Sequence, residues 1–289
     1  MFIILIQKTN GENFLDVYFF KWQYKQRGLK NINWYSFYLW KEPNKMQNQY
    51  SIKIYSDGAE INAMRQMARN DYLSGFTTNP SLMKRAGVTN YLKFANQVVR
   101  EFPEYCVSFE VFGQTPDVMA KEAKILSELG PNVYVKIPII DLKGNYSTDL
   151  IHELSSQGIK VNVTAITTDL QVQAALAALC PTSPAFVSLF VGRVADTGAD
   201  PIDFVKNAVE MVSDFDNVET LWASTREVYN ITQAEQLGVD IITVPPVILQ
   251  KYNERRSFTP DDVALDTVHG FDKDIKTLGF SILDDTVTA

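Results

Sequence analysis

Short β-rich runs alternate with helical stretches eight times along the chain, and this alternation constrains the fold more than any other feature of the sequence. The predicted strands are residues 52–55, 75–77, 106–111, 133–137, 160–163, 185–189, 220–222 and 241–244. The predicted helices are residues 59–69, 91–101, 116–129, 149–157, 169–179, 201–212, 226–236 and 247–252, with a further helix at 260–278. Strict alternation of strand and helix is typical of a parallel sheet, because parallel neighbours need a long crossover connection.

Several strands are apolar on both faces, as in the run VYVKI that starts at Val133 and the run DIITV that starts at Asp240. Such strands are covered on both sides in the folded protein. Eight units from Met46 to Ala289 suit a closed (β/α)8 barrel, which typically takes about 250 residues. The alternative is an open doubly wound sheet, but no GxGxxG follows the first strand. We therefore predict an α/β fold, a (β/α)8 TIM barrel with a C-terminal helical extension and an atypical N-terminal extension.

The first 45 residues differ in composition from the rest of the chain. They hold 12 of the 34 aromatic residues, contain no alanine and carry a charge of +4, whereas the chain from Met46 carries −11. We predict an N-terminal extension over residues 1–45 and the barrel over residues 46–289. The bias favours a segment that is disordered or outside the native domain, translated from upstream of a start at Met46. The alternatives are an arm that binds a partner or a membrane surface, and genuine added structure.

Charge and composition exclude several classes of function. The formal net charge of −7 provides no broad positive field for nucleic acid or an anionic membrane. No apolar run approaches the roughly 20 residues of a membrane span, and Cys106 and Cys180 do not form a CxxC pair. We expect a soluble, cytoplasmic enzyme that acts on small acidic or neutral molecules without a cofactor. The sequence leaves open whether it forms a homo-oligomer.

In a barrel of this kind, functional residues lie at the carboxyl ends of the strands and in the loops that follow them. Seven of the eight predicted strands have hydrophilic residues at that end. These residues are Asp57, Thr77, Thr78, Asn79, Glu110, Lys136, Asn162, Thr164, Ser188, Arg193, Ser224 and Arg226. The sequence therefore predicts a polar site at one end of the barrel.

Lys136 is the most informative of these residues because its neighbours along the strand are apolar. Alternation along the strand places it on the same face as Tyr134 and opposite Val135 and Ile137. Burial lowers the pKa of a lysine, and a neutral amine can attack a carbonyl carbon to form a Schiff base. The alternatives are a lysine that extends to solvent from the strand end and a structural ion pair with Glu110.

Arg193 and Arg226 end two consecutive units, and each is accompanied by a serine. Guanidinium groups with hydroxyls suit a phosphate dianion, and the late loops of such barrels often bind phosphate. The alternative is that they are surface arginines paired with Asp196 or Glu227. Glu110 and Asp57 are candidates for general acid–base catalysis, although carboxylates at strand ends also serve structural roles.

The two histidines, His152 and His269, lie on a predicted helix and in the C-terminal addition, so we expect surface or packing roles for both. Metal-dependent aldol chemistry would need several His, Asp or Glu ligands at one site, and the sequence predicts no metal site. The chemistry implied is amine catalysis, in which an iminium group at Lys136 accepts the electrons released by carbon–carbon cleavage.

Six motifs and Asp57 resemble the transaldolase family, including its short fructose-6-phosphate-aldolase-like members. The motifs are Thr77-Thr-Asn-Pro-Ser81, Val107-Ser-Phe-Glu-Val111, Val135-Lys-Ile-Pro138, Asn162-Val-Thr164, Phe190-Val-Gly-Arg193 and Ala223-Ser-Thr-Arg226. They occur in the family's order between about Ile52 and Leu249, which is nearly the whole predicted barrel. The resemblance implies transfer of a dihydroxyacetone unit from a ketose phosphate to an aldose phosphate, so sugar phosphates are the expected partners, with neither nucleic acid nor membrane.

The resemblance also implies roles for the site residues. Lys136 would form the Schiff base, and Glu110 and Thr164 would relay protons through a water molecule. Asp57 would handle the proton of a substrate hydroxyl. The residues expected to bind substrate are Thr78, Asn79, Asn162, Ser188, Arg193, Ser224 and Arg226, with the arginines on the phosphate. A glutamate at position 110 is typical of the family's transferases rather than of its aldolases.

The sequence also departs from the family pattern at positions that flank the expected catalytic residues. Leu189 replaces the usual proline before Phe190, Thr225 replaces the usual phenylalanine before Arg226, and Ala165 begins a divergent segment after Thr164. Two alternatives to a transaldolase therefore stay open. One is an aldolase that releases free dihydroxyacetone, and the other is a barrel that binds sugar phosphate without catalysis.

Overall fold

The computed structural model describes residues 4–8, 15–19, 35–38 and 50–282 of the 289-residue chain. The chain divides into two units. One unit is Gln49–Arg256, and the other consists of Met1–Asn48 together with Ser257–Ala289.

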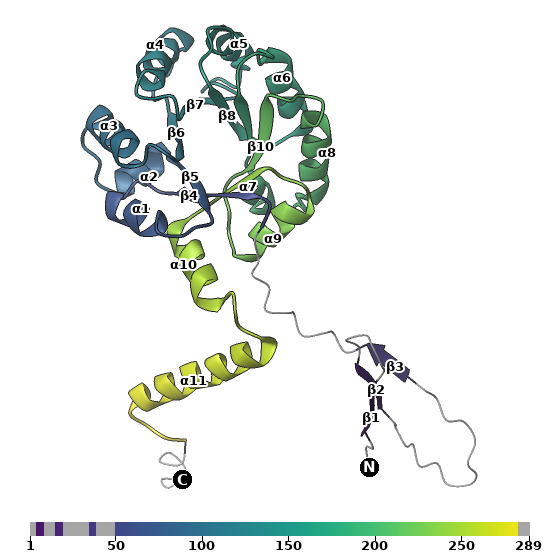
Figure 1. The fold of residues 1–289 in the computed structure, drawn as a ribbon. Coiled ribbons are helices and arrows are strands. Elements are labelled where there is room, and N and C mark those ends of the chain that lie inside the picture. Colours follow the sequence, from purple (N-terminus) through teal and green to yellow (C-terminus); the bar gives the residue numbers. More distant parts are fainter. Residues whose placement is uncertain (1–3, 9–14, 20–34, 39–49, 283–289) are drawn as a thin grey trace. The chain divides into compact units, whose positions relative to one another are not determined.

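Gln49–Arg256 contains a closed barrel of eight parallel strands, as predicted (Figure 1). The strands are β4 (Lys53–Asp57), β5 (Leu73–Thr77), β6 (Cys106–Glu110), β7 (Val133–Pro138), β8 (Val161–Ile166), β9 (Ala185–Leu189), β10 (Val218–Trp222) and β11 (Ile241–Val244). They follow one another around the ring in chain order, and β11 closes it by pairing in parallel with β4. The carboxyl ends of all eight strands therefore lie at the same end of the barrel.

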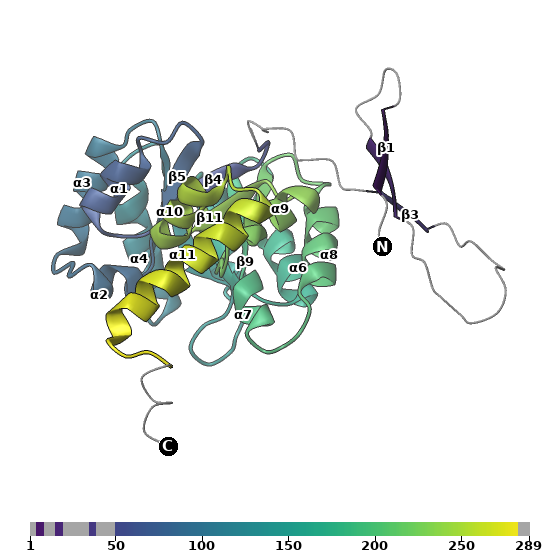
Figure 2. The same ribbon diagram turned by 90° about the horizontal axis from the view of Figure 1, so that it is seen from below.

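Helices surround the ring of strands, with α1–α3 on one side and α6 and α8 on the other in the view of Figure 2. Their bounds are α1 (Ile61–Met67), α2 (Pro80–Arg85), α3 (Tyr91–Glu101), α4 (Pro116–Ser127), α5 (Thr148–Ser156), α6 (Asp169–Ala178), α7 (Val191–Ala195), α8 (Ile202–Val212), α9 (Tyr229–Gln236) and α10 (Pro246–Arg255). The sequence prediction missed the short helices α2 and α7. α2 begins three residues after β5 ends, and α7 begins two residues after β9 ends.

The predicted helix 226–236 was wrong at its start, because α9 begins only at Tyr229. The backbone N–H groups of Arg226 and Glu227 both donate to Oδ1 of Asn230, at 2.9 and 3.1 Å. These bonds hold the two residues in a loop. Arg226 is thus a loop residue that follows β10.

The apolar core has two parts that reflect the alternation of side chains along the strands. Outward residues such as Val135 and Ile137 pack against the helices and are fully buried. Inward residues fill the barrel below its carboxyl end, where Phe186 packs with Tyr55, Leu221 and other residues. Tyr134 stacks on Phe186 with ring centroids 3.8 Å apart. These aromatic side chains fill the barrel below the polar residues at the carboxyl ends of the strands.

The second unit contains a three-stranded antiparallel sheet of β1 (Ile4–Lys8), β2 (Leu15–Phe19) and β3 (Tyr35–Tyr38). The prediction that residues 1–45 do not belong to the native domain stays a prediction, and most of them lie outside the described residues. The helix predicted over 260–278 is α11 (Pro260–Leu278), which begins with a capping box between Thr259 and Asp262. In the part of the chain that the structure describes, no helix is both long and apolar enough to cross a membrane.

Candidate active site

Lys136 points into the barrel from β7, on the same face as Tyr134, and that shared face is what the alternation along the strand predicts. Its side chain is 6% exposed, so it does not extend to solvent. The register of the sheet pairs it directly with Glu110 on β6, and its Nζ lies 3.0 Å from Oε2 of that carboxylate. Nζ also donates to the carbonyl oxygen of Thr78, at 2.9 Å. The amine is therefore held inside the barrel between a carboxylate and a carbonyl group.

Asp57 ends β4 at the same end of the barrel. Its Oδ1 accepts a hydrogen bond from the hydroxyl of Thr77, at 2.7 Å. Burial raises the pKa of Asp57, while the positive charge of Lys136 and the Thr77 hydrogen bond lower it by less. The nearby charges of Arg85 and Glu110 have smaller and opposite effects. A carboxyl group whose pKa is raised in this way is suited to exchanging protons with a substrate.

Thr78 and Asn79 follow β5, and both are engaged in local contacts. The hydroxyl of Thr78 donates to the carbonyl oxygen of Ser108, at 3.0 Å, so this residue contacts Lys136 through its backbone alone. Asn79 is the N-cap of α2, where its Oδ1 accepts from the backbone N–H of Leu82. The substrate-binding roles predicted for their side chains stay predictions.

Three buried polar side chains form a hydrogen-bonded chain across β6, β8 and β9. The amide nitrogen of Asn162 donates to the hydroxyl of Ser108, at 3.1 Å, and the hydroxyl of Ser188 donates to Oδ1 of Asn162, at 2.6 Å. All three are at most 2% exposed. The structure thus brings Asn162 and Ser188 together and holds them in one orientation.

Thr164 lies two residues beyond Asn162 on β8, on the same inward face, and is 1% exposed. Among the residues that the structure describes, none is a hydrogen-bond partner of its Oγ1. A buried hydroxyl without a protein partner is available to a ligand or to solvent. The next residue, Ala165, has φ of 63°, and the β8–β9 register shifts between Val163 and Ile166. This irregularity turns the chain directly after Thr164.

The loops after β9 and β10 approach each other closely at Gly192. A Cβ atom on Gly192 would lie 1.8 Å from the carbonyl oxygen of Ser224, a distance that no side chain can occupy. Ser224 itself has φ of 66°. The two loops that carry Arg193 and Arg226 are therefore packed together, and glycine is required at the contact.

Arg226 pairs with Asp196, one of the two acids that the alternative interpretation named. Nε and Nη2 of Arg226 lie 3.1 and 2.5 Å from the two carboxylate oxygens, and both side chains are about half exposed. The ion pair raises the pKa of Arg226 and lowers that of Asp196. Arg193 is exposed on α7, and its charge also acts on Asp196. The pair with Asp196 uses Nε and Nη2 of Arg226.

Sequence analysis gave no role to Thr77 and missed Ser108 and Thr243. Ser108 is two residues before Glu110, so the alternation of β6 alone indicates that it faces inward. Thr243 lies in a strand that was interpreted as apolar on both faces. It is 3% exposed, and its Oγ lies 2.5 Å from the hydroxyl of Thr77.

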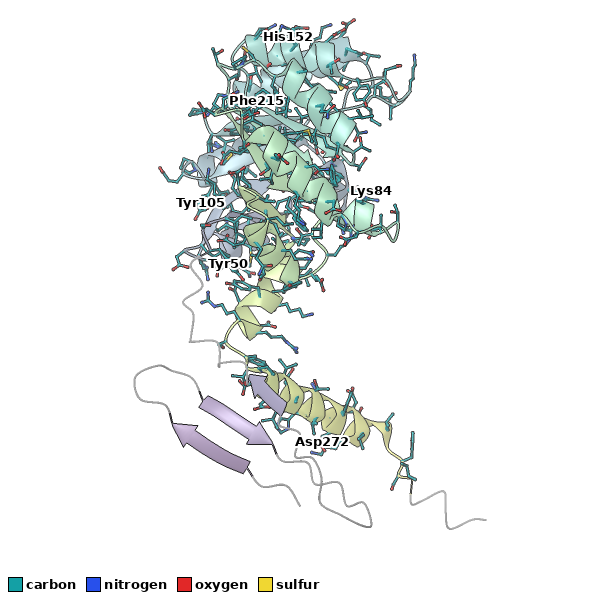
Figure 3. The ribbon with its side chains drawn as sticks, turned by 90° about the vertical axis from the view of Figure 1, so that its right-hand side faces the viewer. Tyr50, Lys84, Tyr105, His152, Phe215 and Asp272 are labelled. Carbon is teal, nitrogen blue, oxygen red and sulfur yellow. The ribbon has the colours of Figure 1, made fainter. Side chains whose placement is uncertain are left out.

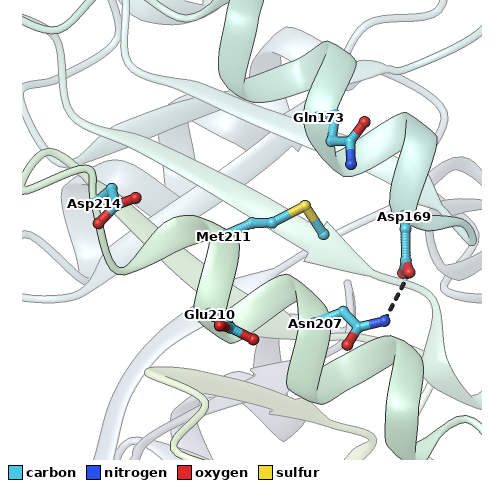
Figure 4. A pocket seen from close by; sticks show the side chains of 6 residues that line it. All are labelled: Asp169, Gln173, Asn207, Glu210, Met211 and Asp214. Atoms are coloured by element: carbon cyan, nitrogen blue, oxygen red, sulfur yellow. Dashed lines mark hydrogen bonds between the residues drawn. The ribbon is translucent and has the colours of Figure 1, made fainter.

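Other features of the barrel unit lie away from these residues. His152 is exposed on α5 (Figure 3), where its Nδ1 lies 3.1 Å from the carbonyl oxygen of Ala178. A groove of about 380 Å³ lies between α6 and α8 (Figure 4). Its residues are Asp169, Gln173, Asn207, Glu210, Met211 and Asp214. Three carboxylates and no basic group line it, so it does not suit a phosphate.

The family model described as transaldolase/fructose-6-phosphate aldolase matches residues 54–287. The chain is similar to a "Probable transaldolase" of Dehalococcoides mccartyi, at 33% identity over 69% of this chain and 89% of that protein. It is also similar to proteins of the same name from Bdellovibrio bacteriovorus and Desulforudis audaxviator, at 34% and 35% identity over 69% of this chain. These two matches cover 88% and 89% of the respective relatives. The chain therefore belongs to the transaldolase/fructose-6-phosphate aldolase family.

Proposed function

We propose that this protein is a transaldolase that transfers a dihydroxyacetone unit between sugar phosphates through a Schiff base at Lys136. The single observation that carries the proposal is the amine of Lys136 inside a closed barrel, 3.0 Å from the carboxylate of Glu110. A carboxylate at this distance can accept a proton from the amine, and the neutral amine is a nucleophile for a ketone.

In the first step, Nζ attacks the ketone carbon of the donor, a C–N bond forms, and the former carbonyl oxygen leaves as water. The protons for this exchange pass between Glu110 and the substrate, and we assign the relaying water to the free hydroxyl of Thr164. The product is an iminium ion. Its positive charge draws electrons from the bond between the α- and β-carbons, which weakens that bond.

In the second step, Asp57 takes the proton of the hydroxyl two carbons from the iminium carbon. The bond between the carbon that bears this hydroxyl and the carbon next to the iminium carbon breaks, an aldehyde leaves, and the bonding electrons convert the iminium into an enamine. The enamine then adds to the carbonyl carbon of an acceptor aldose, and Asp57 returns its proton to the new hydroxyl. Hydrolysis of the new iminium releases the product ketose and restores the amine.

We assign the substrate phosphate to the place where Gly192 meets Ser224, because Arg193 follows Gly192 directly and Arg226 is two residues after Ser224. Because Asp196 occupies two donors of Arg226, the phosphate meets the remaining donors of Arg226 together with Arg193. Asn79, Asn162 and Ser188 are assigned to substrate hydroxyls.

The proposal is tested by incubating the protein with a ketose phosphate and borohydride, which reduces the iminium to a stable amine. We expect a three-carbon adduct on Lys136 by peptide mass spectrometry. Lys136→Ala should form no adduct. Lys160→Ala is the matched control, because Lys160 contacts the carbonyl oxygen of Pro131 at the opposite end of the barrel and should not affect the adduct. A wild-type protein without an adduct at Lys136 contradicts the proposal.

The same assay separates transfer from simple cleavage. With a labelled donor and an aldose phosphate acceptor, a transferase forms a new labelled ketose phosphate, and free dihydroxyacetone stays low. An aldolase releases labelled dihydroxyacetone at the same rate with or without the acceptor. A barrel that only binds substrate gives neither product, although the donor phosphate still binds.

A further inference from the structure

A short chain of hydroxyl groups lies behind Asp57. The hydroxyl of Thr77 donates to Oδ1 of Asp57, at 2.7 Å, and lies 2.5 Å from the hydroxyl of Thr243. Thr77 is 2% exposed and Thr243 is 3% exposed. The three residues come from β4, β5 and β11, which are neighbours in the barrel. Asp57 is thus connected through Thr77 to the strand that closes the ring.

The direction of the hydrogen bonds in this chain follows from the number of protons available. An ionised carboxylate can only accept, so the single hydroxyl proton of Thr77 is used on Asp57. The oxygen of Thr77 must then accept the hydroxyl proton of Thr243. Both hydroxyl dipoles therefore point toward the carboxylate, and each bond strengthens the other in a buried environment.

The backbone of Thr243 also takes part in a hydrogen bond. The hydroxyl of Thr225 donates to the carbonyl oxygen of Thr243, at 2.7 Å, and Thr225 is 3% exposed. Thr225 stands between Ser224 and Arg226 in the loop that we assign to the phosphate. Thr243 therefore contacts both Thr77, which bonds Asp57, and Thr225 in the loop that we assign to the phosphate.

We propose that Thr243 is a positioning residue, which acts through Thr77 to orient the carboxylate of Asp57 and to favour its ionised form. Thr77 holds Oδ1, and the other oxygen, Oδ2, receives the proton of the substrate hydroxyl. This inference rests on the proposed function, in which Asp57 takes that proton when the carbon–carbon bond breaks. Thr243 touches neither the substrate nor the amine.

The inference predicts a change in the pH dependence of the transfer rate. The charged groups near Asp57 also act on its pKa. They are Lys136 on β7, Arg85 on α2 and Glu110 on β6. Thr243→Val changes none of them and keeps the shape of the side chain. Loss of its hydroxyl removes one dipole that favours the ionised carboxylate, so the pKa of Asp57 should rise.

The test measures transfer by Thr243→Val as a function of pH. We expect kcat to fall on the order of tenfold, as is reasonable for a misplaced reacting group, with KM little changed. The acid limb of the kcat profile should move to higher pH. Borohydride should still trap the three-carbon adduct from dihydroxyacetone, because Lys136 is untouched. Thr243→Ser should restore both the rate and the profile.

Two further variants distinguish positioning from a general loss of structure. Thr220→Val removes a hydroxyl that is equally buried but bonds Asp240 on the outer side of β10, so the acid limb should not move. The double variant Thr77→Val/Thr243→Val should be no slower than Thr77→Val, because Thr243 acts through Thr77. Should Thr243→Val fold poorly, Thr243→Ala tests the same hydroxyl without an added methyl contact.

An unmoved acid limb in Thr243→Val, or a Thr243→Ser variant as slow as Thr243→Val, overturns the inference. Additive effects of the Thr77 and Thr243 substitutions also overturn it. These results differ from a failure of the proposed function, which would appear as a wild-type protein without an adduct at Lys136.

Discussion

Asp57 combines a raised pKa in the folded protein with the catalytic role that we propose for it. Asp57 is the last residue of β4, at the carboxyl end of the barrel strands. Burial raises the pKa of its side chain despite the positive charge of Lys136. A raised pKa means that the folded protein disfavours the ionised form. Active sites often hold groups that lower stability in this way, because the chemistry needs them there.

Asp57→Asn should therefore raise the stability of the protein at neutral pH. Because the pKa of Asp57 is higher in the folded than in the unfolded chain, the folded chain binds more protons between the two values. The free energy of unfolding of the wild type therefore decreases as the pH rises from the pKa of Asp57 in the unfolded chain, about 3.9, through its higher pKa in the folded chain. Asp57→Asn has no such carboxyl group. Its free energy of unfolding in urea should therefore exceed that of the wild type by an amount that grows with pH across this range and disappears below it.

Asp141→Asn is the matched control and should show the opposite sign. Hydrogen bonds from the side chain and backbone N–H of Asn145 lower the pKa of Asp141 in the folded protein. Its contribution to stability is therefore present at neutral pH and lost as the pH falls. Equal pH dependence of unfolding in wild type and Asp57→Asn would contradict the raised pKa of Asp57.

At the scale of the elements, the site depends on loops that meet at a single glycine. The loops after β9 and β10 carry Arg193 and Arg226, and they touch where Gly192 faces the carbonyl oxygen of Ser224. Ser224 adopts a left-handed backbone conformation at this point, which is costly for a residue with a side chain. The arrangement persists because the surrounding loops and the ion pair of Arg226 with Asp196 hold it.

Gly192→Ala should separate these two loops. The added methyl group would lie 1.8 Å from the Ser224 carbonyl oxygen, so the backbone of one loop must move. We expect a loss of about 2 kcal/mol or more in the free energy of unfolding and a higher KM for phosphorylated substrates. Urea unfolding and steady-state kinetics measure the two effects.

The control for this substitution is Gly270→Ala on α11, where no atom lies within 4 Å of the added Cβ. Alanine favours a helix more than glycine, so this variant should not be less stable than wild type. Unchanged stability and KM in Gly192→Ala would show that the two loops are not held together at this contact.

At the scale of the whole molecule, the barrel unit depends on residues just before its first strand. Oε1 of Glu235 on α9 accepts from the backbone N–H of Ser51, and Oε2 accepts from that of Ile52, at 3.1 and 2.8 Å. The ring of Tyr50 packs against that of Tyr252 on α10, with centroids 6.1 Å apart. The family model begins only at residue 54.

A chain that begins at Met46 should therefore fold and retain the activity of the full chain, because it keeps Tyr50, Ser51 and Ile52. A chain that begins at Lys53 loses their hydrogen bonds to Glu235 and the packing on Tyr252. We expect the shorter chain to be less stable by about 2 kcal/mol or more. Thermal unfolding and the transfer assay compare the two. An insoluble or inactive chain from Met46 would show that residues 1–45 are part of the native structure.

Much of the barrel could be predicted from local patterns in the sequence. Apolar runs placed all eight strands, and the limits of β9 and β11 agree with the prediction. Alternation along β7 also placed Lys136 on the same face as Tyr134, opposite Val135 and Ile137. Both succeed because strand formation and side-chain direction depend on neighbouring residues, with a period of two along the strand.

The partners of the site residues depended on the tertiary structure. The sequence allowed Arg226 to meet Asp196, Glu227 or a phosphate, and the choice of Asp196 follows from the approach of two loops 30 residues apart. Thr243 was not predicted as a site residue because its strand resembles a fully apolar one. Its hydroxyl contacts that of Thr77, which is 166 residues earlier in the chain. Local sequence therefore determined the strands and the face of β7 that Lys136 shares with Tyr134. Closure of the ring decided which groups surround Asp57, and the approach of the segments after β9 and β10 decided the partner of Arg226, because those contacts join residues that are distant along the chain.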